Sequence, residues 1–165
     1  MNAIIIRHVL PKDLDECFMV ETSGFPPDEA ATRETIRLRI ESFPEGFLVA
    51  EAEERVVGIL NSAAADQHDI SDEELKQLIG HHPGGKNMVV FALAVLPEYQ
   101  RQGIARSLMS RFIEEAREQD KESVLLMCKA HLVAYYGRMG FSHIGVSKST
   151  HGGAEWHEMR LRLKQ

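Results

Sequence analysis

The chain has 165 residues, of which 44% are hydrophobic and 27% charged, as in an ordinary globular protein with one core. Its net charge of −6 argues against a nucleic-acid-binding protein, and no apolar run approaches the roughly 20 residues that cross a bilayer. Two cysteines, Cys17 and Cys128, do not predict a disulfide framework, and the N-terminus lacks a signal-peptide pattern. We therefore expect one domain over residues 1–165, in a reducing, cytoplasmic setting and without a membrane.

The first part of the chain predicts a strand, two helices and a hairpin. Pro11 suits the first turn of a helix, and Asp28 is a residue type that caps one. In chain order we expect a strand at 3–9, a helix from Pro11 to the break at 23–27, a helix capped by Asp28 and ended by Pro44, and strands at 47–52 and 56–62 around a turn at 53–55.

The second part alternates apolar strands with helices. The helix after Gly103 has the clearest pattern, with apolar residues at i, i+3, i+4, i+7, i+8 and i+11 from Ala105 to Ala116. We expect a short helix at 72–79, a turn at 81–85, a buried strand at 88–95, the helix from Gly103, a strand at 124–128, a short helix at 132–139, and a hairpin of 143–147 with 155–163.

This order predicts an α/β (α+β) fold with a mixed sheet of about six or seven strands and about four helices. The segment Tyr99-Gln100-Arg101-Gln102-Gly103-Ile104-Ala105-Arg106 joins the apolar strand to the amphipathic helix. Small residues there leave the first backbone N–H groups of the helix accessible, and the helix dipole and two arginines add positive charge. These features predict an anion site suited to a phosphate or pyrophosphate.

The pattern Gln-x-x-Gly-x-Ala resembles the acetyl-CoA pyrophosphate loop of the GNAT acetyltransferase superfamily. The strand Phe91-Ala92-Leu93-Ala94-Val95 before it follows the same order, as do Leu126-Met127-Cys128 and Tyr136-x-Arg138-x-Gly140-Phe141 after it. The details are most similar to arylalkylamine N-acetyltransferases of the serotonin type and their microbial relatives.

The resemblance implies a splayed sheet and acetyl-CoA as co-substrate, with no metal. The strands at 88–95 and 124–128 would part at their carboxyl ends. Backbone groups of Leu93, Ala94 and Val95 would then bind the pantetheine arm. The backbone amides that would hold the pyrophosphate are those of Arg101, Gln102, Gly103, Ile104, Ala105 and Arg106.

The resemblance also makes Tyr136 the expected catalytic residue. Its hydroxyl would protonate the leaving thiolate as a general acid, whereas the alternative is a packed core aromatic. Vertebrate arylalkylamine enzymes carry a His-x-His that relays the amine proton, but Val89 and Phe91 stand at those positions here.

The sequence therefore leaves open which group accepts the proton of the amine. Glu21, Glu29, His81 and His82 can each accept a proton, although each is expected at the surface, and solvent is a further route. A metal cluster of Asp66, His68, Asp69, His81 and His82 is not favoured because its spacing matches no familiar ligand pattern. Cys128 is expected to be a packed thiol.

The expected reaction is transfer of an acetyl group from acetyl-CoA directly to a primary amine in a ternary complex. The expected acceptor is a small arylalkylamine or polyamine, and Phe25, Pro26 and Phe91 are candidates to line an apolar acceptor site. The alternatives are a peptide N-terminal or protein lysine acetyltransferase and a CoA-binding regulatory module without turnover. A homodimer is compatible with each of these.

Overall fold

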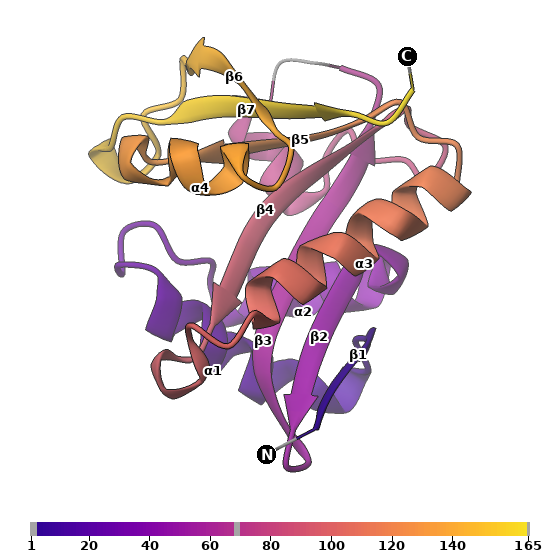
Figure 1. Ribbon diagram of the computed structural model, residues 1–165, viewed down its shortest axis with the longest axis vertical. Helices are drawn as coiled ribbons and strands as arrows, with labels where there is room; N and C mark the ends of the chain where they lie inside the picture. The colour runs from indigo at the N-terminus through magenta and orange to yellow at the C-terminus, as the bar shows by residue number, and fades with distance from the viewer. Residues whose placement is uncertain (1–2, 68–69, 165) are drawn as a thin grey trace. The chain divides into compact units, whose positions relative to one another are not determined.

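The computed structural model describes residues 3–67 and 70–164. Within them, seven strands form one mixed sheet in the hydrogen-bonded order β1-β2-β3-β4-β5-β7-β6 (Figure 1). The strands are β1 (Ile4–His8), β2 (Phe47–Ala52), β3 (Arg55–Ala65), β4 (Asn87–Val95), β5 (Ser123–Cys128), β6 (Ser142–Val146) and β7 (His157–Arg162). The α-helices are α1 (Leu14–Gly24), α2 (Arg33–Ser42), α3 (Ile104–Glu118) and α4 (Val133–Gly137). The predicted mixed sheet with about four helices is confirmed.

Six short 3₁₀ turns occur between these elements in the described residues. They are η1 (Pro11–Asp13), η2 (Pro44–Gly46), η3 (Glu73–Gln77), η4 (Pro97–Tyr99), η5 (Ala130–Leu132) and η6 (His151–Gly153). The helix expected at 72–79 is therefore only the 3₁₀ turn η3. Strand β3 is longer than expected, because it begins at Arg55 and continues to Ala65.

The expected cap of α2 was wrong. Thr32, and not Asp28, caps this helix, and its hydroxyl accepts from the backbone N–H of Thr35 at 3.1 Å. The chain between the two positions is a turn in which the amides of Glu29 and Ala30 both donate to the carbonyl of Pro26. That turn occupies the residues that the prediction placed in the first turn of the helix.

The backbone divides into two compact units. The first unit comprises Met1–Ser62 and Ala92–Phe112, and the second comprises Ala63–Phe91 and Ile113–Gln165. Strands β3 and β4 and helix α3 each run from one unit into the other.

In the first unit, β1, β2 and β3 form an antiparallel meander, and β2 turns into β3 through Glu53 and Glu54. Both turn residues have positive φ, 51° and 64°, as a tight hairpin turn requires. Gly58 of β3 lets α3 approach the sheet, because a Cβ there would lie 3.2 Å from a methyl of Leu108 and 3.3 Å from one of Ile104. The first half of α3 therefore packs closely on this hairpin, in front of β2 and β3 in Figure 1.

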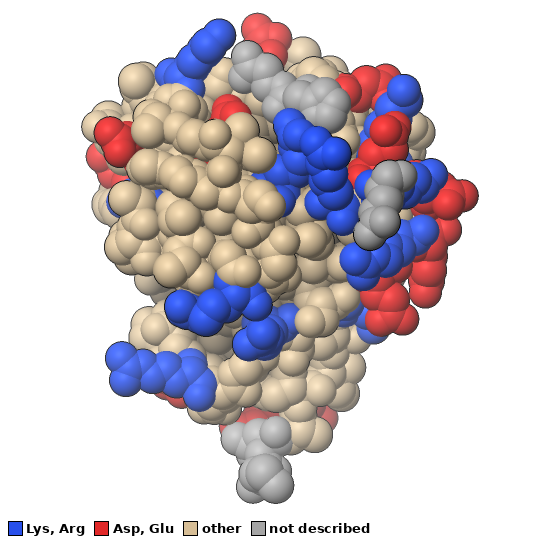
Figure 2. Space-filling model, turned by 45° about the horizontal axis from the view of Figure 1, so that its top comes forward, with Lys and Arg blue, Asp and Glu red and all other residues tan. Residues whose placement is uncertain are grey.

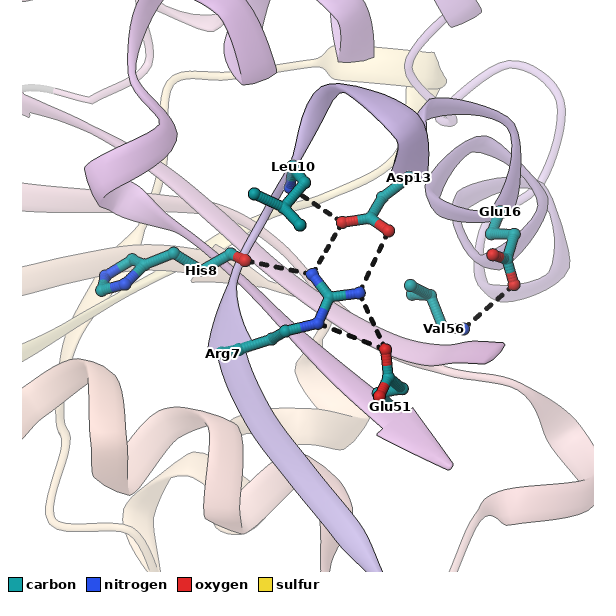
Figure 3. Close-up of polar contacts among 7 residues, drawn as sticks. All are labelled: Arg7, His8, Leu10, Asp13, Glu16, Glu51 and Val56. Atoms are coloured by element: carbon teal, nitrogen blue, oxygen red, sulfur yellow. Dashed lines mark hydrogen bonds and ion pairs between the residues drawn. The ribbon is translucent and has the colours of Figure 1, made fainter. Parts of the chain in front are cut away.

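A polar cluster ties β1 and η1 to β2 in the first unit (Figure 3). The guanidinium of Arg7 donates to both oxygens of Asp13, at 2.8 and 3.1 Å, and to Glu51 at 3.0 Å. The buried carboxylate of Asp13 also accepts from the backbone N–H of Leu10 at 2.8 Å. Burial by itself would raise the pKa of Asp13, but the bonds from Arg7 and Leu10 outweigh it and hold that pKa below its ordinary value.

In the second unit, β5 pairs in parallel with β4 and antiparallel with β7, which in turn pairs with β6. The turn before β4 is held by Lys121, whose buried ammonium donates to the carbonyls of Pro83 and Gly85 at 2.5 and 2.6 Å. Desolvation lowers the pKa of Lys121. A buried apolar cluster lies beside these strands and joins β3, η3, β4 and β5; its members are Ala63, Ala65, Ile70, Leu75, Val89 and Leu125.

Candidate active site

The loop between β4 and α3 carries the residues that are predicted to bind the pyrophosphate. The Nε2 of Gln100 donates to the carbonyl of Val95 at 3.0 Å and so fastens the loop to the end of the strand. Arg101 and Gly103 both have positive φ, 64° and 81°. A Cβ at Gly103 would meet nothing within 4 Å, so the space beside this residue is open to a ligand.

The start of α3 supplies backbone donors at the same place. The first helical bond runs from the N–H of Ser107 to the carbonyl of Gly103 at 3.0 Å. The amides of Ile104, Ala105 and Arg106 therefore precede the hydrogen-bond ladder of the helix. Such amides and the helix dipole favour a phosphate at this end.

The side chains of the predicted pyrophosphate residues fit this arrangement. Arg101, Gln102, Gly103 and Arg106 are exposed, and Ala105 is half-buried. Ile104 is buried under the helix start and anchors it. The two exposed guanidinium groups can pair with phosphate oxygens, while the buried side chain of Ile104 holds the backbone in place.

The predicted pantetheine residues lie on the last part of β4. The ladder between β4 and β5 runs from the pair Asn87–Ser123 to the pair Val90–Leu126, and β4 then continues to Val95. Leu93 is half-buried, and Ala94 and Val95 are buried. Their backbone thus lies beyond the last pair of that ladder.

Tyr136 lies on α4 in the second unit. Its ring is buried and makes edge-on contacts with Tyr135, at 5.2 Å between centroids, and with Phe141 at 5.9 Å. Burial, with smaller contributions from Tyr135 and Cys128, raises the pKa of the Tyr136 hydroxyl. The phenol is therefore protonated throughout the neutral range, which is the form that donates a hydrogen bond.

The structure places the three candidate acceptor residues in different surroundings. Phe25 is half-buried and Pro26 exposed, both on the loop after α1 in the first unit. Phe91 is half-buried in the second unit, where it packs against the apolar cluster, as Met127 also does. Phe91 therefore contributes to packing and also presents part of its ring outward.

Glu21 is not at the surface, contrary to expectation. It is 3% exposed, and its Oε2 accepts from the backbone N–H of Ala31 at 2.9 Å. Arg39 is also buried and donates to Asn61 at 3.1 Å. Burial lowers the pKa of Arg39 to about 10, and the charge of Glu21 opposes that shift. Glu21 is thus a buried counter-ion and an anchor for the loop that carries Phe25.

The two loop histidines are both engaged. The Nδ1 of His81 accepts from the backbone N–H of Ala64 at 2.9 Å, so the lone pair that a base would use is occupied. His82 is exposed, and its Nε2 lies 2.9 Å from Asp66. Hydrogen bonds from His82 and from the backbone of Lys86 lower the pKa of Asp66. Glu29 is half-buried in the turn before α2.

The remaining candidate residues are the metal ligands and Cys128. His68 and Asp69 lie outside the described residues, and among the described ones no group of three or more His, Cys, Asp or Glu side chains is arranged to hold a metal. Cys128 is buried, and desolvation raises the pKa of its thiol to about 11, as expected for a packed thiol.

On the face drawn in Figure 2, Lys and Arg side chains stand in separate groups with uncharged surface between them.

Two features of the site were missed from the sequence. The motif contains Gln100 but does not indicate its bond to Val95, and the sequence suggests Glu21 only as a base. A glutamine at the junction of a strand and a loop is a weak signal for such a side-chain to backbone hydrogen bond. For Glu21 no local pattern predicts the contact with Ala31.

The chain matches the acetyltransferase (GNAT) family over residues 12–141. This match covers most of the chain, which therefore belongs to the GNAT family of acetyl-CoA-dependent N-acetyltransferases. It is similar to serotonin N-acetyltransferase of Mesocricetus auratus, with 26% identity over 162 residues, covering 96% of this chain and 77% of that protein. A Bacillus subtilis protein named probable hydrolase YhcX is 30% identical over 132 residues, but the match covers 74% of this chain and only 25% of that protein.

Solved structures share the fold. The loading GNATL domain of CurA from Lyngbya majuscula superposes with a TM-score of 0.87 at 17% identity, covering 98% of both chains. The yncA protein of Salmonella typhimurium, solved with its cofactor acetyl-CoA, has a TM-score of 0.71 at 18% identity and covers 99% of this chain and 95% of that one. In the part of the chain that the structure describes, no helix combines the length and apolar character needed to cross a membrane.

Proposed function

We propose that this protein transfers the acetyl group of acetyl-CoA directly to the primary amine of a small acceptor, an arylalkylamine or a polyamine, in a ternary complex. The observation that carries this proposal is the loop into α3. Gly103 leaves an open space, and the amides of Ile104, Ala105 and Arg106 precede the helical ladder beside it.

In this proposal, Arg101 to Arg106 hold the pyrophosphate, and the backbone of Leu93 to Val95 holds the pantetheine arm. Acetyl-CoA supplies a thioester, which an amine attacks once the amine is neutral. The exposed guanidinium groups of Arg101 and Arg106 add affinity for phosphate. The bond from Gln100 to Val95 keeps strand and loop in fixed register and so preorganises both halves of the cofactor site.

Tyr136 acts as the hydrogen-bond and proton donor to the departing thiolate. A thiol has a reference pKa of about 8.5, so its thiolate leaves readily and needs only modest help. The raised pKa of Tyr136 keeps its proton in place until negative charge develops on sulfur. Electrostatic stabilisation by a fixed donor then lowers the barrier.

The amine loses its proton to solvent. The only lone pair of neutral His81 is taken by the amide of Ala64, and Glu21 is buried as a partner of the amide of Ala31. His82 is paired with Asp66 at the surface. These contacts engage Glu21, His81 and His82, and the proton acceptor in this proposal is solvent.

Likeness to a serotonin N-acetyltransferase supports a small amine as the acceptor. Phe25, Pro26 and Phe91 contribute apolar surface suited to an aryl or alkyl group. The two buried, free cysteines support a reducing, cytoplasmic setting.

The proposal is tested with the purified chain, acetyl-CoA and a panel of arylalkylamines, polyamines and short peptides, with thiol release as readout. We expect acetylation of at least one small amine with kcat/KM at least tenfold above every peptide. A preference for peptides would identify a peptide or lysine acetyltransferase. Tight acetyl-CoA binding by calorimetry without any transfer would identify a regulatory CoA-binding module.

A further inference from the structure

Helix α1 lies against the end of β4 at a point that has no room for a larger side chain. Gly24 is the last residue of α1, Ala94 is the last but one of β4, and both belong to the first unit. A Cβ added to Gly24 would lie 2.9 Å from the Cβ of Ala94, whereas carbon atoms in contact prefer about 3.5–4.0 Å. The helix can therefore approach the strand this closely only with glycine at position 24.

Gly24 continues the buried side of α1. Cys17, Val20 and Glu21 of this helix are all buried, and position 24 follows them at i+7, i+4 and i+3. Residues at these spacings share one side of a helix. Ala94 is also buried, so the contact between the helix end and the strand is shielded from solvent.

The end of β4 that receives this contact is the part proposed to hold the pantetheine arm. Beside it, the N–H of Leu96 donates to the carbonyl of Val57 in β3 at 2.8 Å, and the side chain of Gln100 donates to the carbonyl of Val95 at 3.0 Å. These bonds fix the strand end in the plane of the sheet. Helix α1 supports the same strand end from one face, through Ala94.

The loop after Gly24 is fastened to α1. The N–H of Phe25 donates to the carbonyl of Glu21 at 3.2 Å, and the carboxylate of Glu21 accepts from the N–H of Ala31 at 2.9 Å. Both ends of the loop are thus bonded to the last turn of the helix. A displacement of Gly24 away from Ala94 would therefore carry the loop away from the strand.

We propose that Gly24 is a positioning residue for the acceptor, because its contact with Ala94 sets the spacing between the loop that carries Phe25 and the strand end that holds the pantetheine arm. This role rests on the proposed function, in which the amine binds beside Phe25. A side chain at position 24 forces the two elements apart. The helix end yields, since the strand end is held by its hydrogen bonds to β3 and to Gln100. The acceptor then loses its fit while the cofactor site is retained.

Gly24→Ala tests this role with one added methyl group, measured in the wild-type protein and in an Ala94→Gly background that lacks the methyl group it would meet. The probe is the better substrate of 2-phenylethylamine and spermidine. In the wild-type background we expect KM for the amine to rise at least fivefold while the Kd of acetyl-CoA stays within a factor of two. In the Ala94→Gly background, adding Gly24→Ala should change KM by less than twofold.

Ile40→Val is the control for a general loss of stability, because it removes a buried methyl group from α2. It should leave KM at the wild-type value. A wild-type KM in Gly24→Ala, or an equal rise of KM in both backgrounds, would overturn the positioning role.

Urea unfolding measures the contact without any activity. Gly24→Ala should lower the midpoint of unfolding in the wild-type background and not in the Ala94→Gly background, because only the first of these is overpacked. Equal shifts in both backgrounds would refute the contact. Absence of acetyl transfer to any amine by the wild-type protein would refute the proposed function, while the unfolding cycle would still decide whether Gly24 and Ala94 set the spacing of helix and strand.

Discussion

The carboxylate of Glu21, at the end of α1, accepts a hydrogen bond from the backbone amide of Ala31 at 2.9 Å. The nine residues between them, including Phe25 and Pro26, form a loop that this contact closes. Because Glu21 is buried with Arg39, the contact also lies next to a second buried charge. Glu21, which the sequence suggested as a surface base, is instead buried and anchors the loop that carries Phe25 and Pro26.

Replacing only Glu21 or only Arg39 should lower the free energy of unfolding. We expect Glu21→Ala to lower the free energy of unfolding by about 3 kcal/mol, because the charge of Arg39 then remains buried without its carboxylate. The double variant Glu21→Leu with Arg39→Met should recover at least half of that loss. Urea unfolding measures both. A single variant within about 0.5 kcal/mol of wild type would show that the pair is not coupled.

Gly103→Glu should abolish acetyl-CoA binding. The new side chain enters the open space beside the helix start and brings a negative charge to the place proposed for the pyrophosphate. Calorimetry should give a Kd raised at least 100-fold.

Gly80→Glu is the matched control for that change. Gly80 also has positive φ, 91°, and a Cβ added there would likewise meet nothing within 4 Å. Both variants carry the same backbone strain of about 1 kcal/mol and the same charge. If both bind acetyl-CoA equally well, the loop at Gly103 does not hold the cofactor.

Tyr136→Phe should lower kcat by about 100-fold while the Kd of acetyl-CoA stays within a factor of two, since only the donor to the leaving thiolate is lost. Tyr135→Phe removes the neighbouring hydroxyl and should leave kcat nearly unchanged. The pKa of Tyr136 is raised, so no loss of rate from its ionisation is expected below pH 10. A Tyr136→Phe enzyme with wild-type kcat, under conditions where chemistry limits the rate, would remove it from the mechanism.

Deprotonation by solvent makes a specific prediction for pH dependence. We expect kcat/KM to rise tenfold per pH unit up to the pKa of the amine itself. His82→Gln or Glu29→Gln should leave that profile unchanged. A further limb near the histidine reference value of about 6.5, removed by His82→Gln, would identify that residue as the base.

Asp13 should make the free energy of unfolding depend on pH in the acid range. Its pKa is lower in the folded protein than its ordinary value, so its contribution is complete above about pH 4 and is lost as pH falls through the folded value. Asp13→Asn should cost about 2 kcal/mol at pH 7 and much less at pH 2. Asp15→Asn, which breaks the exposed pair with Arg33, should cost under 1 kcal/mol at either pH. Urea unfolding at the two pH values measures these differences, and an equal cost of Asp13→Asn at both would contradict the assignment.

Much of the fold follows from local pattern. The apolar stripe of α3 predicted which side is buried, and Leu108, Met109, Phe112 and Ala116 are indeed buried. The short apolar run of β2 was placed at its observed bounds, Phe47–Ala52. These features depend on the period of 3.6 or 2 residues and on turn residues close in sequence, so the sequence alone is sufficient to predict them.

The sequence by itself thus determined the order of the elements, the loop from Arg101 to Arg106 and membership of a family. Only the tertiary structure decided that Glu21 is buried, that His81 has its Nδ1 occupied, and that His151 meets Glu73. Each of these contacts joins residues ten or more positions apart. Burial and hydrogen bonding depend on which segments the fold brings together, and that choice is made by the packing of the whole chain, not by any local pattern of residues.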